Sequence, residues 1–316
     1  MGDIYQDFTC GQILSFGGVT LADKRSRDIV GAPFQSESVR NYGLSIMVNA
    51  EPAGLSRNER QLMEHFAAEE RITITAADVV ALREVSRGTA HRILSRLAEK
   101  GWLVRVKRGV YSPTPLGAGG SAKAASEPWV LAMELFAPCY ISGWSAAGHW
   151  DLTEQIFNAT AVVTATAQRA AEQDHGGVSF RVRTMPEEKL FGTRRVWLGS
   201  RRVEVADPSR LLVDCLADPL LGGGGRHVID VVRAYWRSEH ADPELLLRHA
   251  TRFGVGSVFK RLGFLTERFG AAPDFWLDAC RAQLTRGISD LDPAGPKRGS
   301  IVSRWNLRVN LPVGDE

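Results

Sequence analysis

The sequence lacks the cysteine pattern of a disulfide framework or of a zinc site. Its four cysteines, Cys10, Cys139, Cys215 and Cys280, lie far apart and form no CxxC pair. Such spacing is typical of reduced thiols in a cytosol. The seven histidines form neither an HExxH nor an HxxxH pattern. We therefore expect no metal site and no cofactor.

Long apolar runs are missing as well. No run approaches the roughly 18 residues that a membrane helix requires, and the N-terminus lacks a basic region followed by an apolar one. These absences predict a soluble cytoplasmic protein with no membrane partner. At 316 residues and 44% hydrophobic content, the chain has material for about two domains.

Positive charge is concentrated in one stretch, Ser86–Tyr111. It contains seven Arg or Lys residues and a single acid, Glu99, so its net charge is +6, whereas the whole chain carries +3. Because the rest of the chain is nearly neutral, any contact with nucleic acid should be regional and sensitive to salt.

This basic stretch has the pattern of a helix followed by a hairpin. An apolar stripe recurs at offsets of three and four residues, and it consists of Ala90, Ile93, Leu94 and Leu97. Ser86 can cap the helix start, and Gly101 supplies a left-handed stop. Two short strands should follow, Trp102–Val106 and Val110–Tyr111, joined by the turn Lys107, Arg108 and Gly109.

Two further helices are predicted upstream. Ser56 and Glu59 form an S-x-x-E capping box for a helix that runs to about Glu70, with an inner face of Leu62, Met63 and Phe66. Thr75 and Asp78 open a second, shorter helix through Leu82. Helix, turn, basic helix and basic hairpin in this order predict a winged helix-turn-helix that binds double-stranded DNA.

We predict four regions along the chain. Residues 1–50 show little periodicity and form a poorly ordered extension, and the hypothesis that translation starts at Met47 follows from where the organised sequence begins. The winged unit covers 55–116, and the small residues at 117–127 predict a linker. The second domain covers 128–312.

The second domain has strand patterns first and helix patterns later. Short helices are expected at Pro128–Leu135 and Ser145–Trp150. The expected strands are Cys139–Ser142, Asn158–Thr166, Val178–Thr184, Val196–Leu198, Arg202–Val205 and Ile301–Asn310. A helix capped by Asp207 should turn Leu211, Leu212, Cys215 and Leu216 inward, and four more should follow at Arg226–Trp236, Pro243–Phe253, Val258–Phe269 and Pro273–Leu284. The four glycines Gly222–Gly225 predict a flexible connection. This order indicates an α+β class with an antiparallel or mixed sheet.

Several segments in this order resemble the AbiEi-type antitoxins of type IV toxin-antitoxin systems. They are the capped first helix, VSRGTAHRILSRLAEKGWLVRVKRGVY, YISGWSAAGHWDLTEQIF and EVADPSRLLVDCL, within about Leu55–Asn310. The resemblance implies a winged helix-turn-helix followed by an α/β antitoxin domain. It also implies a non-enzymatic repressor of its own promoter that opposes a nucleotidyltransferase-like toxin.

The predicted DNA contacts follow from the winged unit and this resemblance. Residues near the start of the basic helix should meet base edges, namely Arg87, Thr89, His91 and Arg92. The remaining cations should meet phosphates, namely Arg96, Arg105, Lys107 and Arg108. Winged proteins often bind inverted repeats as pairs, and we expect this protein to bind an inverted repeat in its own promoter in the same way.

Two basic groups of the second domain suggest a further electrostatic surface. One flanks a predicted hairpin and comprises Arg194, Arg195, Arg201 and Arg202; the other comprises Lys297, Arg298, Arg304 and Arg308. Each is either a solvated surface or a contact for flanking DNA, RNA or an acidic face of the toxin. Two other functions stay open: a nuclease or nucleotide-handling enzyme that the winged unit targets, and a ligand-responsive repressor. Glu204 with Asp207 could form a nuclease pair, but Pro208 fits a helix start better.

Overall fold

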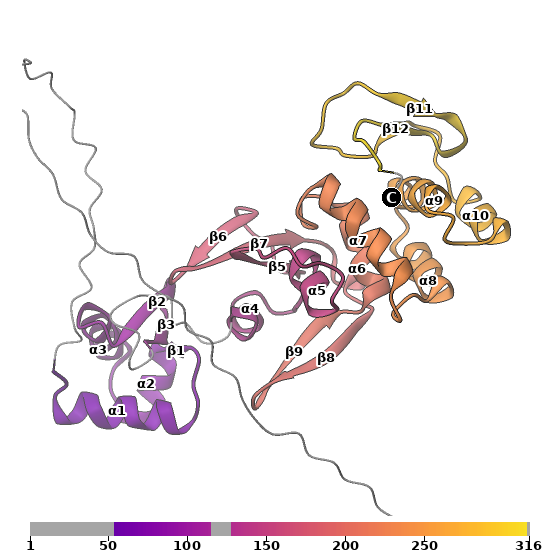
Figure 1. The fold of residues 1–316 in the computed structure, drawn as a ribbon. Helices are drawn as coiled ribbons and strands as arrows, with labels where there is room; N and C mark the ends of the chain where they lie inside the picture. Colours follow the sequence, from indigo (N-terminus) through magenta and orange to yellow (C-terminus); the bar gives the residue numbers. More distant parts are fainter. Residues whose placement is uncertain (1–53, 115–127, 315–316) are drawn as a thin grey trace, which may run out of the picture. The chain divides into compact units, whose positions relative to one another are not determined.

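The computed structural model describes residues 54–114 and 128–314. The predicted N-terminal extension, the start at Met47 and the linker at 117–127 lie outside the described residues. The first described segment forms three helices and a small sheet (Figure 1). In chain order its elements are α1 (Arg57–Ala68), β1 (Ile74–Thr75), α2 (Ala76–Arg83), α3 (Arg87–Glu99), β2 (Leu103–Lys107) and β3 (Val110–Pro113).

Local capping sets the helix boundaries of this winged unit. The backbone N–H of Ser56 donates to the Glu59 carboxylate at 2.8 Å, and the N–H of Thr75 donates to Asp78 at 2.7 Å. The Ser86 hydroxyl accepts from the backbone N–H of Thr89. These caps confirm the predicted helix starts, because each satisfies backbone donors that the first turn leaves free.

The core of the winged unit lies beneath α3. Ala90, Leu94 and Leu97 are fully buried there and pack with Leu62 and Phe66 of α1. The three-stranded antiparallel sheet has the order β1-β3-β2, with a bulge between Arg105 and Lys107. The predicted apolar stripe is therefore the buried face of α3, and the polar residues of the helix face outward.

The second segment contains a six-stranded mixed sheet with the order β6-β7-β5-β4-β9-β8. β5 runs parallel to β7, and β4 runs parallel to β9, whereas the other neighbours are antiparallel. Its strands are β4 (Cys139–Ile141), β5 (Ala159–Thr164), β6 (Glu172–His175), β7 (Val178–Thr184), β8 (Thr193–Leu198) and β9 (Arg201–Ala206). Two short helices accompany the sheet, α4 (Pro128–Phe136) and α5 (Gly143–His149).

Five helices follow the sheet, as the sequence predicts for an α+β fold. They are α6 (Pro208–Ala217), α7 (Gly225–Arg237), α8 (Pro243–Phe253), α9 (Gly256–Arg268) and α10 (Asp274–Arg281). Asp207 caps α6 and Pro208 occupies its first position, as predicted. Every residue from Pro208 to Leu216 is buried, so α6 is enclosed on its polar side as well.

Three element predictions for this segment were wrong. α5 begins at Gly143, two residues before the predicted start at Ser145. The polar strand β6 was missed because Glu172–His175 has no apolar alternation. The expected strand Ile301–Asn310 is broken. β11 (Ser300–Val302), a 3-10 turn at Ser303–Trp305 and β12 (Leu307–Val309) form an antiparallel hairpin, and β10 (Ser289–Asp290) joins it.

The four-glycine run is packed closely, and it is not the flexible connection expected from its composition. A Cβ atom on Gly222 would lie 2.5 Å from Cγ2 of Val228, and one on Gly225 would lie 2.6 Å from Cδ1 of Leu311. Gly223 and Gly224 have positive φ angles of 88° and 101°. Glycine is needed here because a side chain would collide or force a left-handed backbone.

Candidate nucleic-acid interface

The N-terminal half of α3 presents an uncrowded polar surface. Arg87, His91 and Arg92 are exposed, and a Cβ placed on Gly88 would meet no atom within 4 Å. Among the described residues, no carboxylate pairs with either arginine. Because no described acid holds either guanidinium, both arginines and the His91 imidazole can meet an external acceptor, beside a position that carries no side-chain bulk.

Thr89 has a local partner on each side. Its hydroxyl lies 3.0 Å from the Ser86 hydroxyl and accepts from Nη2 of Arg92 at 3.2 Å. The side chain of Thr89 therefore orients Arg92 in the free protein. Its predicted contact with a base edge would require this hydrogen bond to be shared or exchanged.

Arg96 takes part in an ion-pair cluster that the sequence did not suggest. Glu59 is 3% exposed, and its carboxylate oxygens lie 2.8 Å from Nε of Arg96 and 2.8 Å from Nζ of Lys100. The hydrogen bond from Lys100 outweighs burial and holds the pKa of Glu59 at about 2. The capping box identified Glu59, but its partners lie 37 and 41 residues away, so no local pattern could reveal them.

The wing continues this surface. Arg105, Lys107 and Arg108 are exposed, and among the described residues none of them pairs with an acid. Gly109 has φ of 78°, and a Cβ there would lie 3.9 Å from Cε1 of His91. The tight turn of the wing therefore sits beside α3, so helix and wing offer their cations together.

The predicted basic group of Arg194, Arg195, Arg201 and Arg202 is divided between two faces of the β8–β9 hairpin. Strand alternation places Arg194 and Arg201 on one face and Arg195 and Arg202 on the other. The guanidinium of Arg194 lies 5.2 Å from the ring centroid of Trp150. The four arginines therefore do not form one continuous patch.

Acids offset much of the C-terminal basic group. Lys297 lies 2.6 Å and Arg308 2.8 Å from the carboxylate of Asp290, and Arg304 lies 3.0 Å from Glu267. The bonds from Lys297 and Arg308 lower the pKa of Asp290. This surface therefore offers less free positive charge than its sequence indicates.

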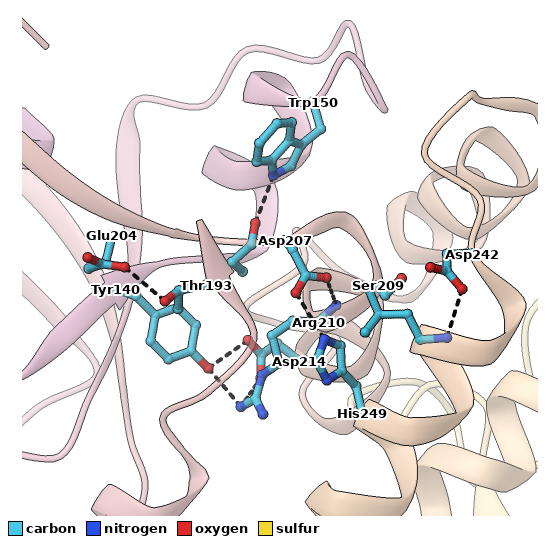
Figure 2. A network of polar contacts seen from close by, with 12 residues as sticks. Tyr140, Trp150, Thr193, Glu204, Asp207, Ser209, Arg210, Asp214, Asp242 and His249 are labelled. Carbon is cyan, nitrogen blue, oxygen red and sulfur yellow. Dashed lines mark hydrogen bonds and ion pairs between the residues drawn. The ribbon is translucent and has the colours of Figure 1, made fainter. Parts of the chain in front are cut away.

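The second domain encloses a polar network, shown in Figure 2. The fully buried Arg210 lies 2.9 Å from Asp214 and donates to the Tyr140 hydroxyl at 2.7 Å, and that hydroxyl donates to Asp214 at 2.9 Å. Burial raises the pKa of Tyr140. The Arg210 guanidinium also lies 4.2 Å from the ring centroid of Phe191 and 4.9 Å from that of Phe253.

The same network includes the helix cap at Asp207. One oxygen accepts from the backbone N–H of Arg210 at 2.9 Å, and the other lies 2.9 Å from Nε2 of His249 (Figure 2). Glu204 accepts instead from the Thr193 hydroxyl at 2.9 Å. Asp207 and Glu204 thus have separate structural partners, which gives no support to a nuclease pair. Among the described residues, no cluster of His, Cys, Asp or Glu could hold a metal ion.

Comparison with known proteins identifies the winged unit. Residues 61–114 match the family model described as "Transcriptional regulator, AbiEi antitoxin". The match begins within α1 and ends after β3, so the winged unit is similar to AbiEi-type transcriptional regulators, and the second domain lies outside the matched residues. No curated protein matches the chain. Within residues 54–114 and 128–314, no helix is both long and apolar enough to cross a membrane.

Proposed function

We propose that this protein is a transcriptional repressor that binds its own promoter through the winged unit. The observation that carries the proposal is the shared surface of α3 and the wing, where five cations lack an acidic partner among the described residues. These cations are Arg87, Arg92, Arg105, Lys107 and Arg108. A helix of this kind fits the major groove, and a basic wing fits the adjacent phosphates.

Base and phosphate contacts divide along this surface. Arg87, His91 and Arg92 reach base edges from the first turns of α3, and Thr89 steadies Arg92 beside them. Arg105, Lys107 and Arg108 meet phosphates, which fix orientation and supply most of the salt-dependent affinity. Arg96 adds a phosphate contact from an exposed side chain while its Nε stays paired with Glu59. Two copies would read an inverted repeat.

The second proposed activity is opposition to a nucleotidyltransferase-like toxin. Its support is the match of residues 61–114 to regulators described as antitoxins. We assign this activity to the second domain, because the winged unit already carries the surface for DNA. Growth rescue by co-expression with the toxin tests the assignment separately from promoter binding.

A ligand-responsive repressor is supported by one feature of the second domain. A hollow of about 440 Å³ opens where β5 and β7 begin, and aromatic residues Trp129, Trp144 and Phe157 line part of it. The rings of Trp144 and Phe157 stack with centroids 4.8 Å apart. A metabolite that raises the melting temperature and lowers operator affinity would favour this function over simple autorepression.

Promoter binding is tested with the purified full chain on two DNA duplexes of equal length, the upstream region of its own gene and a random sequence. Affinity is measured at two salt concentrations. Tight binding to the upstream DNA that weakens with salt is expected. Equal, weak binding to both duplexes would contradict the proposal.

A further inference from the structure

One tryptophan of the chain differs from all the others. Trp197 on β8 is 65% exposed, whereas the other seven tryptophans are buried or half-buried. Among the described residues, no hydrogen bond reaches its indole N–H and no ring packs against it. β8 is an edge strand of the six-stranded sheet, and with β9 it forms the long hairpin visible in Figure 1. A single exposed aromatic residue is common on protein surfaces, so Trp197 is informative only through the residues that flank it.

The strand register places two arginines beside this ring. Trp197 pairs with Arg202, and Arg195 pairs with Glu204 across the hairpin. Directly opposed residues share a face, and so do residues two apart in one strand. Arg195, Trp197 and Arg202 therefore form one surface, which we call the hairpin face. Val196 and Leu198 pack into the core from the opposite side.

The hairpin face keeps an excess of positive charge. The Nε atoms of Arg195 and Arg202 both lie 3.6 Å from the same oxygen of Glu204. The other oxygen of Glu204 accepts from the Thr193 hydroxyl. The two arginine side chains are 69% and 51% exposed, and neither donates a hydrogen bond to another described residue. One carboxylate lies near both guanidinium groups and offsets only one of their two positive charges.

We propose that the hairpin face binds single-stranded nucleic acid, with a base stacked on Trp197 and phosphates at Arg195 and Arg202. A flat aromatic group between cations on an open strand matches the alternation of bases and phosphates along a single strand. A duplex does not fit, because its bases are already stacked and cannot reach the ring. The proposal does not rest on promoter binding, since the hairpin face and α3 share no residue.

The test measures binding of a fluorescently labelled 12-nucleotide strand to the full chain by polarisation, with RNA and DNA of the same sequence. Trp197→Ala should lower the affinity about 5- to 150-fold, as expected when one stacked base is lost. Trp197→Phe should keep most of the affinity. The matched control is Phe275→Ala on α10, because Phe275 is 75% exposed in the same domain.

The charges are tested with a double variant, Arg195→Ala with Arg202→Ala. It should reduce the slope of log affinity against log salt by about 1.4, since each phosphate contact to a single strand contributes about 0.7. Arg248→Ala should leave the slope unchanged, because Arg248 is similarly exposed but lies on α8. Arg92→Ala in α3 should weaken promoter binding and leave single-strand binding intact.

Three outcomes would overturn the proposal. They are unchanged binding by Trp197→Ala, an equal loss in Phe275→Ala, and a Trp197-dependent affinity for duplex alone. Absence of oligonucleotide binding, together with self-association that Trp197→Ala abolishes, would instead assign the face to a second copy of the chain. RNA bound more tightly than DNA would identify RNA as the ligand, and equal affinity would indicate a strand without sugar preference.

Discussion

The winged unit and the second domain differ in the charged groups that they bury. In the winged unit the cations lie on the surface, and the single buried acid, Glu59, has partners that reach solvent. In the second domain Arg210 and Asp214 are fully buried and bind each other. A solvated surface cation changes the free energy of folding little and is available to a ligand. A buried ion pair instead affects the stability of the fold. The comparison therefore separates exposed charges, which can bind a ligand, from the buried Arg210–Asp214 pair, which affects the stability of the fold.

The largest expected effect concerns the buried pair. Asp214→Ala leaves the charge of Arg210 without its carboxylate in a closed interior, and it should lower the free energy of unfolding by about 3–5 kcal/mol. Chemical denaturation measures this loss. Asp230→Ala is the matched control, because Asp230 is an exposed helical aspartate paired with Arg233, and it should change stability by less than about 0.5 kcal/mol. Similar losses in both variants would erase the contrast between the two regions.

Glu59 provides an intermediate case. The pKa of Glu59 is about 2 in the folded protein and near 4.5 in the unfolded chain. Its contribution to the free energy of unfolding is therefore present above pH 4.5 and is lost as the pH falls toward 2. Glu59→Gln can keep the capping hydrogen bond but removes the charge. At neutral pH it should cost about 1–3 kcal/mol, discounted because Arg96 is exposed. Unfolding measured between pH 7 and pH 3 should show the two proteins converging, and a constant difference would exclude the ion-pair cluster as its source.

The surface cations of α3 should affect recognition more than folding. Arg92→Ala should remove about 1–3 kcal/mol of discrimination between the promoter and random DNA, because a bidentate contact to a base is lost. Its melting temperature should stay unchanged. Arg60→Ala on the exposed side of α1 is the control, and competition binding measures both variants. A large stability loss for Arg92→Ala would place it with the buried charges instead.

The smallest effect is expected in the wing. Lys107→Ala should weaken promoter and random DNA alike and reduce the salt slope by about 1, as expected for one phosphate contact. Binding titrations at several salt concentrations measure the slope. If Lys107→Ala changed discrimination as much as Arg92→Ala, the division between base and phosphate contacts would fail.

Much of the fold followed from patterns that span a few residues. The caps at Ser56, Thr75 and Ser86 identified three helix starts, and the bounds of β7 and α8 were predicted without error. These signals are readable because a cap bonds three residues onward and because a strand or helix has a fixed period. The missed strand β6 carries no such period, and it exists because β7 provides its hydrogen-bond partners.

The candidate sites divide in the same way. The sequence by itself determined the winged unit, its apolar stripe and the concentration of cations, since all of these lie within one continuous stretch. Only the tertiary structure decided that Glu59 binds Lys100, that Arg210 is enclosed, and that Trp197 stands exposed between Arg195 and Arg202. The physical reason is distance along the chain. Burial and charge pairing depend on elements that folding brings together, and a helix or strand does not encode what will cover it.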